Sequence, residues 1–252
     1  MSVAKKLTTV AQNMSKVYAA GKEAGVQSEY DRFWDAFQDY GKRTSYSYAF
    51  AGGLNWTKEH FRPKYDLIVA GGSSSMFVDA FRKEEEPLDF VELFNELGIV
   101  LDFSTMGNCI VFDMFQNAKI CHLGVIDLRK KTGSLSNWFR SSYLRKIDLI
   151  RLGTDNDNTF QNSFNGDTAL EEVYFEGVIY ADINFQHSPL IKASIKNIMS
   201  CLSDSTSGTT VSFNLNAVNT AFETSEGAAD GSESEEWLAL VATKPNWTIN
   251  LV

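Results

Sequence analysis

A six-residue pattern recurs in the middle of the chain and constrains the fold more than any other sequence feature. Three segments match Leu-x-x-[Ile/Val]-x-[Leu/Phe], namely "LGVIDL" (123–128), "LRKIDL" (144–149) and "LEEVYF" (170–175). Apolar and polar positions that alternate over so few residues are typical of a strand with one buried face. Such a strand cannot bury its apolar face alone, so we expect the copies to stack edge to edge, with Ile126, Ile147 and Val173 in one hydrophobic column.

The copies recur with a rough period. A degenerate copy, "IVLDFS" (99–104), precedes them, and the central apolar residues then lie 25, 21 and 26 residues apart: Leu101, Ile126, Ile147 and Val173. An aromatic residue lies five to eight residues ahead of each later copy: Phe115, Phe139 and Phe164. This period predicts an α/β fold, a short leucine-rich-repeat-like β-solenoid with strands about 4.8 Å apart. The alternative is a coincidence among Leu-rich strands.

Helices are expected on both sides of the repeats. Residues 4–22 carry an apolar seam formed by Leu7, Val10, Met14 and Val17. This helix either packs on its own domain or forms a short coiled coil that joins identical chains, as in a homotrimer. We expect further helices at 25–41, 86–97 and 189–202, a strand at 211–216, and a helix, a turn at Pro245 and a strand within 235–252.

These segments divide the chain into an N-terminal helical part (1–43) for attachment, oligomerisation and capping, a solenoid (44–215), and an acidic loop with a C-terminal helix-strand cap (216–252).

Composition and charge exclude several classes of protein. The formal net charge is −9, with 32 acidic residues against 23 basic ones, which argues against nucleic acid as a partner. No apolar run is long enough for membrane insertion, and the first residues lack the apolar region of a secretory signal. We therefore expect synthesis in the cytoplasm.

The motifs of enzymes and metal sites are absent. Cys109, Cys121 and Cys201 form no CxxC pair, so we expect reduced thiols, the alternative being a Cys109–Cys121 disulfide. The three histidines have no ligand-like spacing, so we expect no metal and no cofactor. The "DND" at 155–157 lacks the Gly and Glu of a calcium loop and is interpreted as an Asx-rich turn. No nucleophile elbow, zinc-protease helix or dinucleotide fingerprint occurs. We expect a protein that is not an enzyme.

The repeat register predicts one polar surface. Side chains alternate between the faces of a strand, so Asp102, Asp127, Asp148 and Tyr174 should form one outward column. Arg129 and Lys146 should flank it. Aspartates at strand spacing repel by up to roughly 1 kcal/mol per neighbour in water. Either Lys146 and Arg129 offset this as a solvated charged surface, or the column binds a metal ion, sugar hydroxyls or a basic strand.

Two parts of the chain resemble known proteins. The segment "SFNGDTALEEVYFEG" (163–177) resembles the BspA-like class of leucine-rich repeats, which is common in bacterial surface proteins. The block "EYDRFWDAFQDYGKRTSYSYAFAG" (29–52), followed by "FRPKYD" (61–66), is similar to proteins encoded by phages and prophages of gut Firmicutes. The chain departs from the family in having only four or five irregularly spaced repeats.

The resemblance implies a function in a virion. It suggests a structural protein of a phage tail or baseplate, with other tail proteins as partners and a host protein or glycan as receptor. The alternatives are a bacterial surface-type leucine-rich-repeat module that binds proteins, and a glycan-active enzyme.

Overall fold

The structure, a computed structural model, describes residues 50, 57–58, 61–63, 66–69, 76–82, 84–105, 113–131, 134–153, 159–205, 207–223 and 234–252. Several predictions lie outside these residues. They are the helices at 4–22 and 25–41, with Leu7, Val10, Met14 and Val17, most of the strand at 44–52, the 155–157 turn and Cys109.

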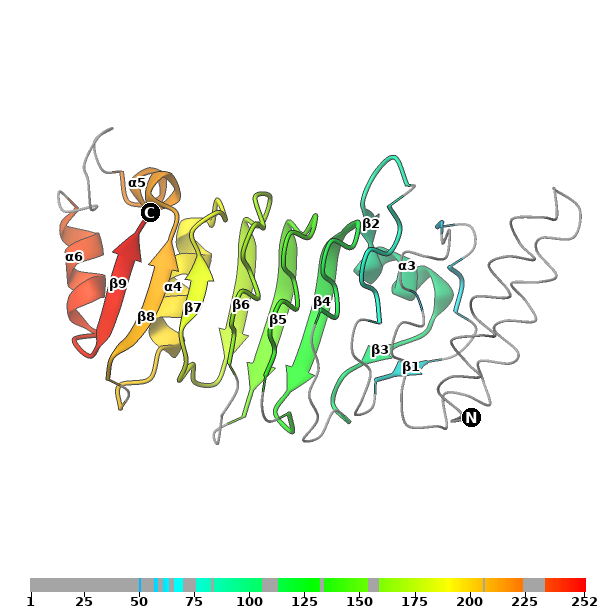
Figure 1. The fold of residues 1–252 in the computed structure, drawn as a ribbon, viewed down its shortest axis with the longest axis horizontal. Helices are drawn as coiled ribbons and strands as arrows, with labels where there is room; N and C mark the ends of the chain where they lie inside the picture. The colour runs from blue at the N-terminus through cyan, green and yellow to red at the C-terminus, as the bar shows by residue number, and fades with distance from the viewer. Residues whose placement is uncertain are drawn as a thin grey trace, which may run out of the picture.

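The described strands form three separate parallel sheets (Figure 1). The first joins β1 (Leu67–Ile68) and β3 (Leu101–Asp102). The second has the order β2 (Leu88–Asp89), β4 (Ile120–Leu128), β5 (Lys146–Leu152) and β6 (Glu172–Glu176). The third has the order β7 (Ile183–Phe185), β8 (Thr209–Phe213) and β9 (Trp247–Leu251).

Four helices connect or cover the described strands: α3 (Phe90–Leu97), α4 (Lys192–Cys201), α5 (Leu215–Ala221) and α6 (Glu235–Ala242). The side chain of Asp89 caps the start of α3, and Gly98 ends it in the left-handed conformation that glycine adopts most readily. Helix α3 therefore begins four residues later than predicted but ends where Gly98 places it. The predicted α4, α6 and β9 are confirmed within a few residues, whereas β7 was not predicted.

A row of phenylalanine rings, which we call the file, runs through the core, and all but one of its neighbouring pairs are stacked. Successive ring centroids lie 5.2, 5.3, 5.7, 5.1, 4.6 and 6.2 Å apart along Phe50, Phe77, Phe115, Phe139, Phe164, Phe185 and Phe213. All seven side chains are buried. Phe115, Phe139 and Phe164, which precede the repeats, therefore pack against one another. Through Phe185 and Phe213 the file continues into the three-stranded sheet.

The expectation of a leucine-rich-repeat-like β-solenoid is wrong, and only the α/β class is confirmed. The described strands are divided among three sheets instead of continuing in one. The degenerate copy at 99–104 supplies β3, which pairs with β1 and not with β4. β6 is the last strand of the four-stranded sheet, and the next strand along the chain, β7, belongs to the three-stranded sheet.

Helix α4 blocks the edge of β6 with side chains. Ser194 Oγ accepts a hydrogen bond from the Val173 N–H at 3.1 Å, and Asn197 Oδ1 accepts one from the Phe175 N–H at 2.6 Å. Asn197 Nδ2 also donates to the Phe175 carbonyl at 3.1 Å. These bonds satisfy backbone groups that an edge strand otherwise exposes to other chains.

The register of the first hexapeptide copy also differs from the prediction. Leu123, not Ile126, lies opposite Ile147, which in turn lies opposite Val173. Ile126 lies opposite Ile150, and Ile150 lies opposite Phe175. The hydrophobic column that was expected to join Ile126, Ile147 and Val173 therefore does not exist.

Candidate binding surface

The outward side of the four-stranded sheet is lined with charged residues. Leu123, Ile147 and Val173 point into the core, and the residue before each of them faces outward. We define the charged face by the outward residues of this sheet: Asp89, His122, Asp127, Lys146, Asp148, Arg151, Glu172 and Glu176. They come from four strands, so the parallel pairing alone brings them together.

At the centre of one row, His122 bridges two neighbouring strands. Its Nδ1 lies 3.0 Å from Asp89 Oδ2 on β2, and its Nε2 lies 3.0 Å from Asp148 Oδ1 on β5. A neutral imidazole has only one N–H, so it donates to only one carboxylate. Two ionised partners therefore favour the imidazolium, which donates from both nitrogens.

Burial and these two carboxylates act in opposite directions on His122. Partial burial lowers its pKa, but the hydrogen bonds to Asp148 and Asp89, together with their negative charges, outweigh burial and raise the pKa above its ordinary value. For Asp148, burial opposes ionisation, yet hydrogen bonds from His122 and Lys146 lower its pKa overall. His122 and Lys146 thus stabilise the charged form of Asp148, and Asp148 stabilises theirs.

The same row continues across β5 to β6. Lys146 lies opposite both His122 and Glu172 in the sheet. Its Nζ lies 3.2 Å from Asp148 Oδ1 and 3.8 Å from Glu172 Oε2. In this row His122 lies between Asp89 and Asp148, and Lys146 lies between Asp148 and Glu172.

A second row crosses the far ends of the same strands. Asp127 lies opposite Arg151, and Arg151 lies opposite Glu176, so the charges alternate across the strands. Arg151 Nε donates to Glu176 Oε2 at 3.2 Å. Arg129 follows β4 and donates to both oxygens of Asp127, which lowers the pKa of that carboxyl.

A less polar strip separates the two charged rows. Val125 and Leu149 pair across β4 and β5, and the Val125 side chain is 46% exposed. Tyr174 faces outward between the buried Val173 and Phe175, beside the register shift between β5 and β6. A ligand on this face would meet aliphatic and aromatic surface flanked by paired charges.

The structure separates the residues of the predicted aspartate column. Asp102 lies on β3 in a different sheet, where its Oδ1 accepts a hydrogen bond from the Ser104 N–H at 2.7 Å. Asp127 lies opposite Arg151, so it is not the neighbour of Asp148. Only Asp148 and Tyr174 remain adjacent. Arg129 forms an ion pair with Asp127, and Lys146 forms one with Asp148.

Sequence reasoning missed His122 and Asp89, which form the centre of the face. His122 was set aside because it has no ligand-like spacing. A signal did exist: His122, Lys146 and Glu172 each come directly before a buried aliphatic residue of consecutive strands. Aligning the strands on those aliphatic residues places the three side chains in one row. Asp89 carries no comparable signal, because β2 is only two residues long.

The described part of the chain holds no group of three or more His, Cys, Asp or Glu side chains arranged for a metal ion. In the same residues, no helix combines the length and the apolar character that crossing a bilayer requires. No protein-family model, curated protein or solved structure matches this chain.

Proposed function

We propose that this chain is a non-enzymatic binding protein of a phage tail or baseplate, which contacts a host surface component through its charged face. The observation that carries the proposal is the cross-strand network centred on His122. Its side chains are held in place by ion pairs before any ligand arrives. Binding then costs little side-chain entropy, which favours affinity for a fixed pattern of charges.

The chemistry of His122 supports binding over catalysis. A general base needs a ring nitrogen that is free to take a proton from a nucleophile or from water. Both nitrogens of His122 face carboxylates at 3.0 Å. The resemblance of residues 29–52 and 61–66 to phage-encoded proteins supplies the virion setting of the proposal.

The test measures binding of the purified chain to intact cells of gut Firmicutes and to a glycan array. We expect the paired substitutions Asp127→Asn and Asp148→Asn to abolish the binding of the unmodified chain. Glu223→Gln is the matched control, because Glu223 is exposed and follows α5, away from the charged face. It should leave binding unchanged.

Two results would contradict the proposal. If the double variant binds as well as the unmodified chain, the charged face is not the binding surface. If the unmodified chain binds neither cells nor glycans, host recognition is rejected. Each paired aspartate contributes at most about 1 kcal/mol to stability, so the double variant should remain folded. Its circular dichroism spectrum and melting temperature check this.

A further inference from the structure

Strand β9 has an open edge. It is the outermost strand of its sheet, and the Val252 N–H donates to the Phe213 carbonyl at 3.0 Å. Because backbone groups of alternate residues point to opposite sides of a strand, even-numbered residues of β9 face β8. Ile249 and Leu251 therefore direct their N–H and C=O groups away from the sheet. Within the described residues nothing pairs with these groups.

The β9 edge lacks the usual protection against pairing with another chain. Natural edge strands are blunted by charged side chains, proline, bulges or a covering element. Within Trp247–Leu251 there is no charged residue and no proline, and the pairing with β8 runs through five residues without a register shift. The edge of β6, by contrast, is blocked by Ser194 and Asn197.

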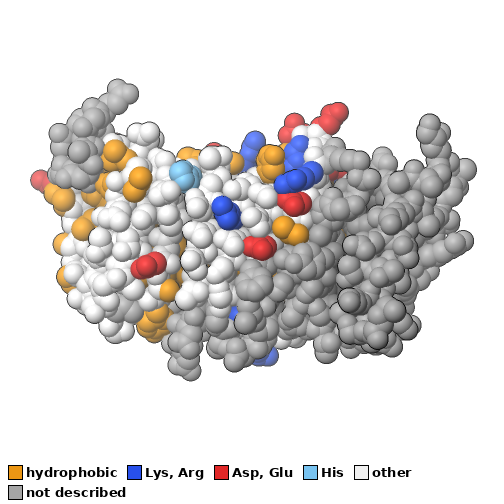
Figure 2. All heavy atoms as spheres, viewed as in Figure 1, with side chains coloured by type: hydrophobic (Ala, Val, Ile, Leu, Met, Phe, Trp, Pro, Cys, Tyr) orange, Lys and Arg blue, Asp and Glu red, His pale blue; other side chains and the backbone are white. Residues whose placement is uncertain are grey.

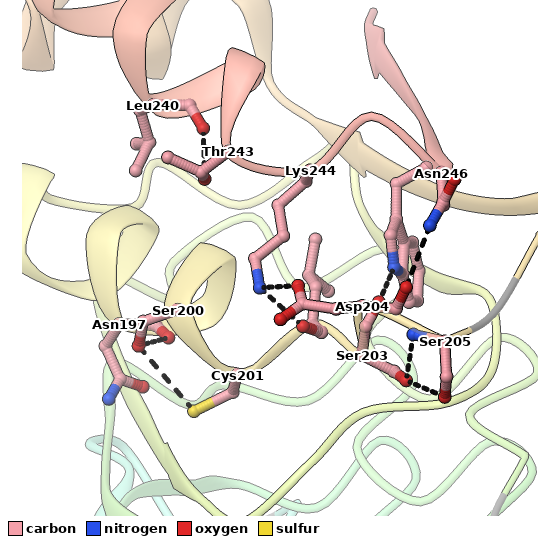
Figure 3. Close-up of polar contacts among 12 residues, drawn as sticks. Asn197, Ser200, Cys201, Ser203, Asp204, Ser205, Leu240, Thr243, Lys244 and Asn246 are labelled. Carbon is pink, nitrogen blue, oxygen red and sulfur yellow. Dashed lines mark hydrogen bonds and ion pairs between the residues drawn. The ribbon is translucent and has the colours of Figure 1, made fainter.

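Hydrogen bonds tie the turn before β9 and the first residue of β9 to residues 202–204 (Figure 3). Lys244 Nζ, in the turn before β9, donates to the Leu202 carbonyl and to Asp204 Oδ1, each at 2.7 Å. Asn246 Nδ2 donates to the Asp204 carbonyl at 2.8 Å, and Trp247 Nε1 donates to the Ser203 carbonyl at 2.7 Å. A strand fixed in this way is ready to pair without first being ordered.

Apolar side chains accompany the edge. Leu238 on α6 is 49% exposed and Val252 is 62% exposed, although both are large hydrophobic residues. Figure 2 shows hydrophobic side chains along the end of the molecule that α6 and β9 form in Figure 1. A partner that extends the sheet at this end would also remove apolar surface from water.

We infer that β9 pairs antiparallel with β9 of a second copy of this chain, about a two-fold axis at Ile249. In this register Ile249 lies opposite its own counterpart, and Trp247 lies opposite Leu251. The two Ile249 residues exchange N–H and C=O bonds, and each Leu251 N–H donates to the other chain's Trp247 carbonyl. The outward groups therefore complement themselves, as a two-fold interface requires. The two three-stranded sheets join into one.

Charge does not oppose a second copy of the chain at the β9 edge, as it does elsewhere on the surface. Each chain carries a formal net charge of −9, so most contacts between two copies would be repulsive. The side chains of β9 are all uncharged, and the exposed ones are Thr248 and Asn250. At this edge two negatively charged copies can therefore approach without placing like charges opposite one another.

The register gives a specific test. Thr248 lies opposite Asn250 of the other copy in a non-hydrogen-bonded pair, where Cα atoms are about 4.5 Å apart and within disulfide range. The single variants Thr248→Cys and Asn250→Cys are oxidised separately and as an equimolar mixture, beside the unmodified chain as a blank for native cysteines. We expect a disulfide-linked dimer only in the mixture. No such dimer in the mixture, or equal amounts in the separate samples, overturns the inference.

A second variant tests the interface without cysteine. The N–H of Ile249 faces away from β8, so Ile249→Pro removes an outward donor while the pairing with β8 remains. Light scattering on the full-length chain should show that its mass falls by half, and unfolding should show a stable protein. A mass that does not change overturns the inference. The charged face is remote from these substitutions, so each single subunit should still bind cells. Loss of the dimer with cell binding retained would therefore separate a failure of this inference from a failure of the proposed function.

Discussion

At the scale of single residues, His122 should make the stability of the fold depend on pH. The pKa of His122 is raised in the folded chain, whereas in the unfolded chain it should be about 6.5. Protonation is therefore tighter in the folded state, and this linkage stabilises the fold. The contribution is complete below about pH 6.5 and is lost as the pH rises through the folded-state pKa.

The variant His122→Asn removes this linkage. At pH 5.5 we expect it to lower the free energy of unfolding by about 1 kcal/mol, because its partners are partly exposed and screened by solvent. The difference from the unmodified chain should shrink as the pH rises towards 9. Urea unfolding at a series of pH values measures it. His187→Asn is the control, since His187 is exposed and lies off the charged face, and a pH-independent loss for His122→Asn would contradict the prediction.

At the scale of elements, α4 substitutes for a fifth strand beside β6. Asn197→Ala leaves the Phe175 N–H and C=O without the bonds that Asn197 now makes. We expect a loss of about 1–3 kcal/mol in the free energy of unfolding, the usual cost of an unpaired buried polar group. The Phe175 amide should exchange faster with deuterium.

Ser200→Ala serves as the matched control for α4. Ser200 is exposed and its hydroxyl donates to the Asn197 carbonyl within the helix, so it makes no direct hydrogen bond to β6. Its stability and amide exchange should match those of the unmodified chain. If Asn197→Ala also matches the unmodified chain in stability and amide exchange, the side-chain hydrogen bonds from Asn197 to β6 do not contribute to stability.

The elements also show how far the sequence could lead. Gly98 and Pro245 correctly marked the end of α3 and the turn before β9, because each acts locally. The register was missed because the hexapeptide is too short. Over nine residues, "ICHLGVIDL" (120–128) aligns with "LRKIDLIRL" (144–152), which matches Ile126 with Ile150. The six-residue pattern instead aligns Leu123 with Leu144, which is three residues away from the observed pairing of Leu123 with Ile147.

The partners of the charged residues could be predicted only in part. Lys146 and Arg129 were expected near the aspartates because they flank them in sequence. The division into three sheets was not predictable from the repeat, because it depends on where α3 and α4 pack. Asp102 shows the consequence: its sequence context resembles that of Asp127, yet it belongs to another sheet.

At the scale of the whole molecule, the phenylalanine file joins segments from Phe50 to Phe213. Because each ring packs on rings from neighbouring segments, truncation of one ring should lower the stability of the whole described core. Phe139 lies at the middle of the file, 5.7 Å from Phe115 and 5.1 Å from Phe164. Phe139→Ala should lower the free energy of unfolding by about 3–5 kcal/mol, which includes the cavity that it leaves.

The transition should also remain a single one. Trp138 packs beside Phe139 at the middle of the file, whereas Trp237 packs against Phe213 at its C-terminal end. If the file couples the two ends, Trp fluorescence and far-ultraviolet circular dichroism should report coincident urea transitions in both the unmodified chain and Phe139→Ala. Tyr143→Ala is the control, since this ring is 48% exposed. Two separate transitions in the unmodified chain would mean that the three-stranded sheet unfolds independently, and the stacked rings would then be local packing instead of a continuous core.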